Sequence, residues 1–196
     1  MNSLLVTYIL QTEKWTSPEL FETKNRIYTF LNPVSYLIAL ENKSLFEQFD
    51  GIFADGSLLV SAIRLVYGKR VTRRSFDMTS LAPELLNYLM ESRKTLYIVA
   101  SGQEQVECSV RIFQEQYPEL RIAGFRNGYF SSDAEMNKEA SHIVELNPDF
   151  LIVGMGALMQ EKFLLKVKKM GYQGIGFTCG GFVHQTAMNR MHYYPN

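Results

Sequence analysis

Residues 149–170 read DFLIVGMGALMQEKFLLKVKKM and join an apolar run, a glycine-containing turn and an amphipathic segment. After Asp149 the run is apolar on consecutive positions, which is typical of a strand buried on both faces of a sheet. In the amphipathic segment, apolar residues and lysines occupy opposite sides of a helix, and Gly171 stands where a helix commonly ends. This stretch predicts a strand that leads directly into a helix.

The same unit recurs on either side of this stretch. We expect strands at 26–31, 51–54, 95–100, 121–125, 149–153 and 174–178, and helices at 57–67, 81–92, 103–117, 134–146 and 158–170. Strands that alternate with helices through short connections form a parallel sheet wrapped by helices. The sequence therefore predicts an α/β fold, a Rossmann-like parallel sheet with helices on both faces, in a single domain over residues 1–196.

The first 25 residues are ambiguous. Residues 3–10 are compatible with a strand, and residues 16–22 with a short helix that begins near Ser17 and Pro18. The N-terminus lacks a basic region and a small-residue cleavage site, so we expect no signal peptide. No run approaches the roughly 18 apolar residues of a spanning helix, so contact with a membrane is expected only at its surface.

The composition narrows the function classes. The 20 Lys and Arg balance the 20 Asp and Glu, which argues against a protein that coats nucleic acid by bulk charge. Two cysteines, Cys108 and Cys179, are too few for a disulfide scaffold and fit reduced thiols in the cytoplasm. We therefore expect a cytoplasmic protein with no nucleic-acid partner.

Polar and glycine residues follow nearly every expected strand. Ligands of such sheets bind beyond the carboxyl ends of the strands, where glycine lets backbone N–H groups approach an anion. The residues at these positions are Asn32, Asp55, Gly56, Ser101, Gly102, Asn127, Gly128, Tyr129, the segment 154–160, Cys179, Gly180 and Gly181. This pattern indicates a rim that binds a phosphate or a nucleotide.

Asp55 is the candidate for acid–base chemistry at this rim. It ends a short strand and precedes a glycine that opens a helix, so an N-cap aspartate is one interpretation. The other is a general base, because partial burial beside apolar neighbours raises the pKa of a carboxyl group toward a useful range.

The segment that starts Gly154-Met155-Gly156 resembles the beginning of a dinucleotide-binding motif. A third glycine and a later acidic ribose ligand are both missing, which disfavours an oxidoreductase that uses nicotinamide. The turn still allows a helix N-terminus to face a phosphate, and a tight turn without a ligand is the alternative. The cluster of three arginines and one aspartate in residues 70–77 fits either a solvated charge run or contacts to a diphosphate.

Several common site motifs do not occur in the sequence. It contains no Asp-X-Asp, no GxSxG and no GxxxxGK[ST] motif, and His142, His184 and His192 lack metal-ligand spacing. We therefore expect no metal site and no cofactor.

Taken together, short motifs spread over residues 26–182 resemble, in their order, the WecG/TagA/CpsF family of bacterial glycosyltransferases. They are the segments TFLNP at 29–33, ADG at 54–56, RVT at 70–72, YPELRI at 117–122, NGYF at 127–130, NPD at 147–149, and GMG at 154–156 through QEK at 160–162.

The resemblance implies an inverting, metal-independent transfer of a sugar from a UDP-sugar to a polyprenyl-diphosphate-linked saccharide. N-acetylmannosamine is the donor sugar typical of the family, and the products feed teichoic-acid linkage units, enterobacterial common antigen, capsule or exopolysaccharide. Such an enzyme is expected at the inner face of the cell membrane as a peripheral protein, and the resemblance allows a homo-oligomer.

The resemblance also assigns roles by position. Asp55 is expected to deprotonate the acceptor hydroxyl, with Thr29 and Asn32 beside it in the pocket. Gly154, Gly156, Gln160 and Glu161 are expected to hold the nucleotide-sugar, opposite the loop that carries Ser101 and Gly102. The other expected substrate-binding residues are Gly56, Arg73, Asp77, Asn127, Gly128, Tyr129, Gly180 and Gly181.

The sequence departs from the family at two places. Residues 183–187 read VHQTA where an Ala-Phe-Asp-Phe-like stretch is common, so glucose-type or uronic-acid-type donors are also open. The sequence stops at Asn196, and we expect it to lack a C-terminal membrane-docking appendage that supplies arginines. The cations left for the diphosphate are Arg73, Arg74, Arg126 and Arg190. A non-catalytic module that binds a nucleotide-sugar is the alternative to an enzyme.

Overall fold

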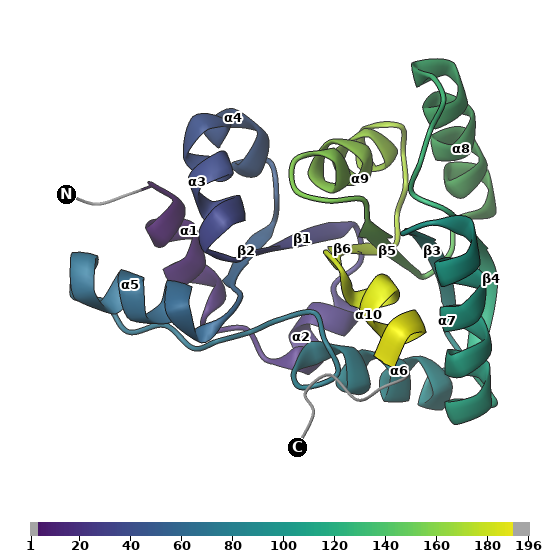
Figure 1. Cartoon of the computed structure of the whole chain (residues 1–196), viewed down its shortest axis with the longest axis horizontal. Helices are drawn as coiled ribbons and strands as arrows, with labels where there is room; N and C mark the ends of the chain where they lie inside the picture. The colour runs from purple at the N-terminus through teal and green to yellow at the C-terminus, as the bar shows by residue number, and fades with distance from the viewer. Residues whose placement is uncertain (1–3, 190–196) are drawn as a thin grey trace.

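The computed structural model describes residues 4–189 and contains one sheet of six parallel strands (Figure 1). The strand order is β2-β1-β6-β5-β3-β4. The bounds are β1 Arg26–Leu31, β2 Gly51–Ala54, β3 Thr95–Ala100, β4 Arg121–Arg126, β5 Phe150–Gly154 and β6 Ile175–Thr178. The expected parallel α/β sheet is confirmed, with ends that differ by no more than one residue from the sequence-based ranges.

Helices cover both faces of this sheet. One apolar core lies under α1 Leu4–Thr12, α3 Pro33–Glu41, α4 Lys43–Phe46, α5 Ser57–Tyr67, α8 Asp133–Leu146 and α9 Met159–Lys169. The other lies under α2 Ser17–Glu22, α6 Leu81–Glu91, α7 Gln103–Gln116 and α10 Phe182–Asn189. Figure 1 shows α9 above the sheet and α6 and α10 below it.

The first described segment, Leu4–Thr12, is a helix, so the strand considered for residues 3–10 is wrong. Leu5, Val6 and Ile9 of α1 are buried, and this spacing puts them on one side of a helix that packs beside β2. The short helix expected at 16–22 is confirmed as α2, and its first turn is capped by Thr16 and Glu19.

One strand departs from the expectation that every strand is covered on both faces. The strand β4 lies at the edge of the sheet, and its residues alternate between exposed and half-buried. The other strands are buried along nearly their whole length.

The topology opens a crevice at the carboxyl edge of the sheet. Neighbouring strands β5 and β3 send their helices to opposite faces, because α9 packs in one core and α7 in the other. The neighbouring strands β1 and β6 diverge in the same way, toward α3 and α10. Loops that part at such switch points leave room for a ligand between them.

Candidate active site

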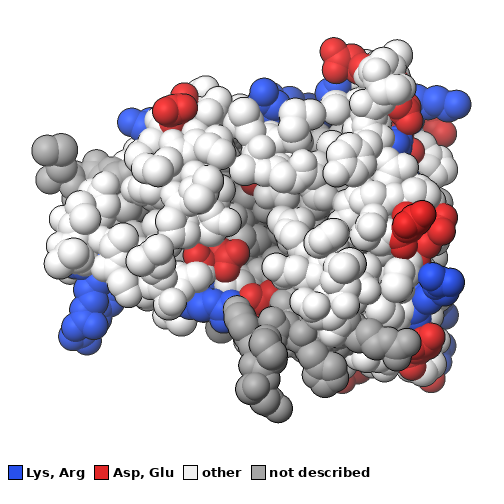
Figure 2. All heavy atoms as spheres, in the orientation of Figure 1, with Lys and Arg blue, Asp and Glu red and all other residues white. Residues whose placement is uncertain are grey.

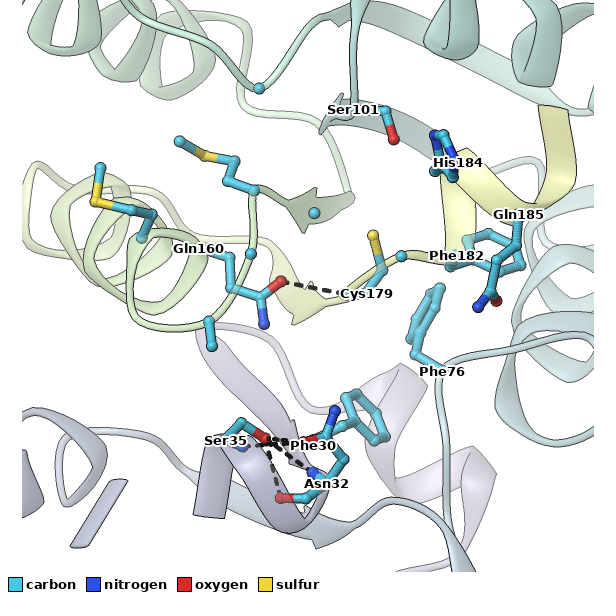
Figure 3. A pocket seen from close by; sticks show the side chains of 18 of the residues that line it. Phe30, Asn32, Ser35, Phe76, Ser101, Gln160, Cys179, Phe182, His184 and Gln185 are labelled. Atoms are coloured by element: carbon cyan, nitrogen blue, oxygen red, sulfur yellow. Dashed lines mark hydrogen bonds between the residues drawn. The ribbon is translucent and has the colours of Figure 1, made fainter. Parts of the chain in front are cut away.

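A pocket of about 1140 Å³ fills this crevice, which is larger than the roughly 300–1,000 Å³ typical of drug-sized ligands (Figure 3). Loops that follow all six strands contribute to its wall. The expected site residues that line it are Asn32, Asp55, Gly56, Arg73, Asp77, Ser101, Gly102, Gly128, Tyr129, Gly154, Gly156, Gln160, Gly180 and Gly181.

Three expected site residues do not line this pocket. Thr29 and Glu161 are fully buried behind its wall. Asn127 is used within its own loop, where its Oδ1 accepts the N–H of Tyr129 at 2.9 Å and its Nδ2 donates to Gln103 Oε1 at 3.0 Å. Thr29 and Glu161 are hydrogen-bonded to each other, so bonds inside the protein occupy all three side chains.

Asp55 is held at the pocket by the segment that follows α5. Its backbone N–H donates to Leu31 O at 2.8 Å, and its carboxylate accepts a short hydrogen bond from Ser75 Oγ. The N-cap of α5 is Gly56, with φ +85° and no side-chain cap, so the N-cap interpretation of Asp55 is wrong.

The pKa of Asp55 is raised above the ordinary 3.8 of an aspartate. Burial is the main cause, and the charge of Asp77 adds to it, while the Ser75 hydroxyl and Arg73 act in the opposite direction. A carboxylate in this setting is a better proton acceptor than an exposed aspartate.

Among the described residues, Arg73 is the one Lys or Arg side chain that lines the pocket. Its guanidinium donates to Asp77 Oδ2 at 2.6 Å and to Thr79 Oγ1 at 3.1 Å, so its position is fixed. Arg74 lies elsewhere, over the Phe53 ring and bonded to the Trp15 carbonyl.

Another cation considered for the diphosphate, Arg126, is held by contacts outside the pocket. Arg126 lies 4.0 Å from the centre of the Phe130 ring and donates to Glu135 Oε1 at 3.2 Å. It does not line the pocket, whereas Phe130 does. Arg190 lies outside the described residues.

The loop between β5 and α9 forms another part of the pocket wall, separated from the strand that precedes Asp55 by β1 and β6. Gly156, at φ +83°, is open to the pocket, and Leu158 is held at φ +72°. Gln160 ties this loop to the next one, because its Oε1 accepts the Gly180 N–H at 3.1 Å, drawn as a dashed line in Figure 3. Backbone strain of this kind clusters at binding sites, where the surrounding contacts hold it in place.

Buried polar groups stand behind this loop. The Glu161 carboxylate accepts from Thr29 Oγ1 at 2.9 Å, from Gln160 Nε2 at 2.9 Å and from the Leu158 N–H at 2.7 Å. Thr178 Oγ1 in turn donates to Thr29 Oγ1 at 2.9 Å. Burial raises the pKa of Glu161 above its ordinary 4.5. Glu161 and Thr29 thus position the wall of the pocket from behind.

A model of the glycosyl transferase WecG/TagA/CpsF family matches residues 10–191 of this chain. The chain belongs to this family of glycosyltransferases. The resemblance found from the short motifs is thereby confirmed over nearly the full sequence.

Relatives within the WecG/TagA/CpsF family have named activities. The chain is 33% identical to a UDP-Gal:alpha-D-GlcNAc-diphosphoundecaprenol beta-1,4-galactosyltransferase of Shigella boydii, over 86% of this chain and 70% of the relative. It is 23% identical to an N-acetylglucosaminyldiphosphoundecaprenol N-acetyl-beta-D-mannosaminyltransferase of Bacillus subtilis, over 92% and 69%. A Staphylococcus aureus enzyme of the latter name is 25% identical, over 73% and 56%.

The pocket of this family member has an aromatic side that the sequence analysis missed. Phe76 stands 5.8 Å from Phe30 and 5.3 Å from Phe182, measured between ring centres, and all three line the pocket (Figure 3). His184 and Gln185 on α10 line it as well. The glycine pair before Phe182 was a usable signal, because a helix that starts at a strand end faces the ligand crevice.

The described residues contain neither a metal-binding cluster nor a membrane-spanning helix. Within residues 4–189, no three His, Cys, Asp or Glu side chains stand close enough together to hold a metal ion. Over the same residues, no helix has the length and apolar character needed to cross a bilayer.

Gly154→Ala is expected to destabilise the protein by about 1–3 kcal/mol, as overpacking does. A Cβ at this position would lie 2.6 Å from the Gly180 carbonyl oxygen and 2.8 Å from Cys179 Sγ, so the β6–α10 loop must shift. Urea unfolding measures the loss. The control is Gly181→Ala, whose Cβ would meet only the Gln185 side chain, at 3.8 Å or more; equal stability of the two variants would contradict the clash.

Proposed function

We propose that this chain is an inverting, metal-independent glycosyltransferase that moves a sugar from a UDP-sugar to a polyprenyl-diphosphate-linked acceptor. Family membership supports glycosyl transfer. The relatives of Shigella boydii and Bacillus subtilis are named for diphosphoundecaprenol-linked acceptors that carry GlcNAc, which supports the acceptor class. Such an acceptor lies in a membrane, and we propose that the enzyme acts at its cytoplasmic face.

The observation that carries the mechanism is the position of Asp55. This partly buried carboxylate shares one pocket with Gly156 and Gln160, which lie after β5. In the proposed reaction the carboxylate takes the proton of the acceptor hydroxyl. The hydroxyl oxygen then bonds to the anomeric carbon as the bond from that carbon to UDP breaks, and UDP leaves with the electron pair.

The departing diphosphate gains negative charge, and preorganised donors stabilise such charge. Arg73 lines the pocket and is the cation proposed for this role. Backbone N–H groups of the glycine-containing loops after β5 and β6 are proposed to assist it. Their approach to an anion is unhindered at Gly156, where nothing lies within 4 Å of the missing Cβ.

The donor sugar is proposed from the named relatives. UDP-galactose comes first because the 33% identical Shigella boydii enzyme is named for it, and UDP-N-acetylmannosamine comes second because of the Bacillus subtilis enzyme. His184 and Gln185 line the pocket where the sequence departs from the family pattern, and they are proposed to select the sugar.

A panel of donors tests the function. We expect a UDP-sugar at about 100 times its Kd to add about 2.7 kcal/mol of stability, and each kcal/mol raises the Tm of a domain of this size by about 2–4 °C. The panel contains UDP-galactose, UDP-N-acetylmannosamine, UDP-glucose and UDP-glucuronic acid, with ADP-glucose and NAD as controls. Donors that stabilise are then assayed for transfer to a prenyl-diphosphate-linked GlcNAc, with and without EDTA. Absence of both binding and transfer across the panel would refute the proposal.

A further inference from the structure

Helix α5 exposes apolar residues on the side that faces away from the core. Only Leu59 and Ile63 of this helix are buried. On the outer side, Leu58 and Val66 are each 69% exposed and Leu65 is 86% exposed. The outer side of a surface helix normally carries polar residues, because water solvates it. The exposed face of α5 is therefore suited to an apolar partner.

The same face has a basic border. The segment 57–76 contains Arg64, Lys69, Arg70, Arg73 and Arg74 and no acidic residue. Arg64, Lys69 and Arg70 are exposed. Figure 2 shows the left side of the molecule, over α5, as a white surface with a blue group below it. A partner that fits this face has an apolar layer for the exposed apolar residues and an adjoining anionic layer for the basic residues.

This face begins at the mouth of the pocket. Gly56 and Ser57, at the start of α5, line the pocket. The preceding strand pairs in register with β1, Leu31 beside Ala54, so α3 begins at the same rim. The start of α3 also exposes an apolar residue, because Val34 is 68% exposed.

We propose that the exposed face of α5, with Leu58, Leu65 and Val66 inserted and Arg64, Lys69 and Arg70 at the headgroups, docks on an anionic lipid surface. Amphipathic helices bind membranes in this way, with apolar residues at the acyl boundary and basic residues near anionic lipids. The inference rests on the proposed function for its purpose, because docking α5 brings the pocket mouth to a lipid-linked acceptor.

A second copy of this chain fits the face less well. A symmetric pair places the same patch on both sides of the interface, and residues 57–76 contain no acidic residue, so Arg64, Lys69 and Arg70 would face no carboxylate of the partner's patch. Like charges brought together repel, whereas anionic headgroups neutralise them.

Sedimentation with vesicles tests the proposal. We expect the chain to bind vesicles of phosphatidylglycerol and phosphatidylcholine, and to bind phosphatidylcholine alone much more weakly. Leu65→Asp with Val66→Asp is expected to lower the partition coefficient at least about tenfold. Lys69→Glu with Arg70→Glu is expected to remove most of the preference for anionic vesicles, at roughly fivefold per basic side chain lost.

The matched control is Leu146→Asp, at the end of α8. Leu146 is 42% exposed and lies just before β5, at the edge of the sheet opposite the pocket. Circular dichroism and thermal melting confirm that each variant is folded. The control should bind vesicles as the unchanged chain does. Equal vesicle binding by the unchanged chain and both α5 variants would overturn the proposal. So would a chain that ignores vesicles and forms a dimer that the Leu65 and Val66 changes dissociate.

Turnover separates this inference from the proposed function. On a soluble acceptor with a short prenyl chain, the Leu65 and Val66 variant should match the unchanged chain, whereas on a vesicle-embedded acceptor it should be at least about tenfold slower. No transfer to either acceptor, with vesicle binding intact, would refute the proposed function and leave the docking surface standing. Equal rates of variant and unchanged chain on the vesicle-embedded acceptor would refute the docking surface alone.

Discussion

Asp55→Asn is expected to slow sugar transfer by about 10²–10⁴-fold while leaving UDP-sugar binding within a few-fold of normal. Asparagine fills the same space and can still accept the hydrogen bond of Ser75, so the pocket keeps its shape. The amide cannot take a proton from an acceptor hydroxyl, which is the role proposed for the carboxylate. Initial rates of transfer and calorimetric titration of the donor measure the two effects separately.

The stability of this variant follows from the raised pKa of Asp55. A carboxyl group whose pKa is higher in the folded than in the unfolded state stabilises the fold at low pH, and this contribution is lost as the pH rises through the folded pKa. At neutral pH the buried charge therefore lowers the free energy of unfolding, and replacing it by an amide removes that penalty. We expect Asp55→Asn to be at least as stable as the unchanged chain.

The raised pKa of Asp55 also determines the pH at which activity decreases on the acid side of the pH profile. A general base must be ionised, so kcat/KM should fall with decreasing pH at a value above the 3.8 of an ordinary aspartate.

The control for the rate of Asp55→Asn is Asp133→Asn, an exposed residue at the start of α8 that does not line the pocket. If Asp55→Asn transfers sugar at the normal rate, Asp55 is not the base. A chain that binds UDP-sugars but transfers none even with Asp55 intact is a binding module.

The strand ends explain why much of the site could be found from the sequence. Buried strands of a parallel sheet are continuous apolar runs, so their last residues are visible in the sequence, and Asp55 and Gln160 each follow one of them. Such a pattern locates the loops at the carboxyl edge. It does not show whether a side chain in a loop faces the pocket, which is why Asn127 was placed there.

Contacts between distant segments could not be found in this way. Thr29 and Glu161 lie 132 positions apart and meet only because α9 packs over β1. The N-terminal segment illustrates a different limit, since a short apolar run fits a strand or a buried helix equally well until its partner is known. The partner of α1 is β2, against which Leu5 and Ile9 are buried.

The buried carboxylate of Glu161 gives the second large effect. Glu161→Ala is expected to lower the free energy of unfolding by about 3–5 kcal/mol, because each buried donor left without its acceptor costs about 1–3 kcal/mol. The change leaves three donors without their acceptor: Thr29 Oγ1, Gln160 Nε2 and the Leu158 N–H. Urea unfolding measures the loss, and Lys162→Ala, exposed on the same turn of α9, is the control and should change stability by less than about 0.5 kcal/mol.

The pH dependence of this loss distinguishes a buried titrating group from a simple cavity. Because burial raises the pKa of Glu161, its contribution to stability is complete below the unfolded pKa and decreases as the pH rises through the folded pKa. The difference between Glu161→Ala and the unchanged chain should therefore be larger in mild acid than at neutral pH. The variant should also bind UDP-sugars more weakly, since Gln160, which holds the Gly180 loop, loses its own anchor. A loss below about 1 kcal/mol with unchanged donor binding would show that the buried contacts of Glu161 do not support the pocket wall.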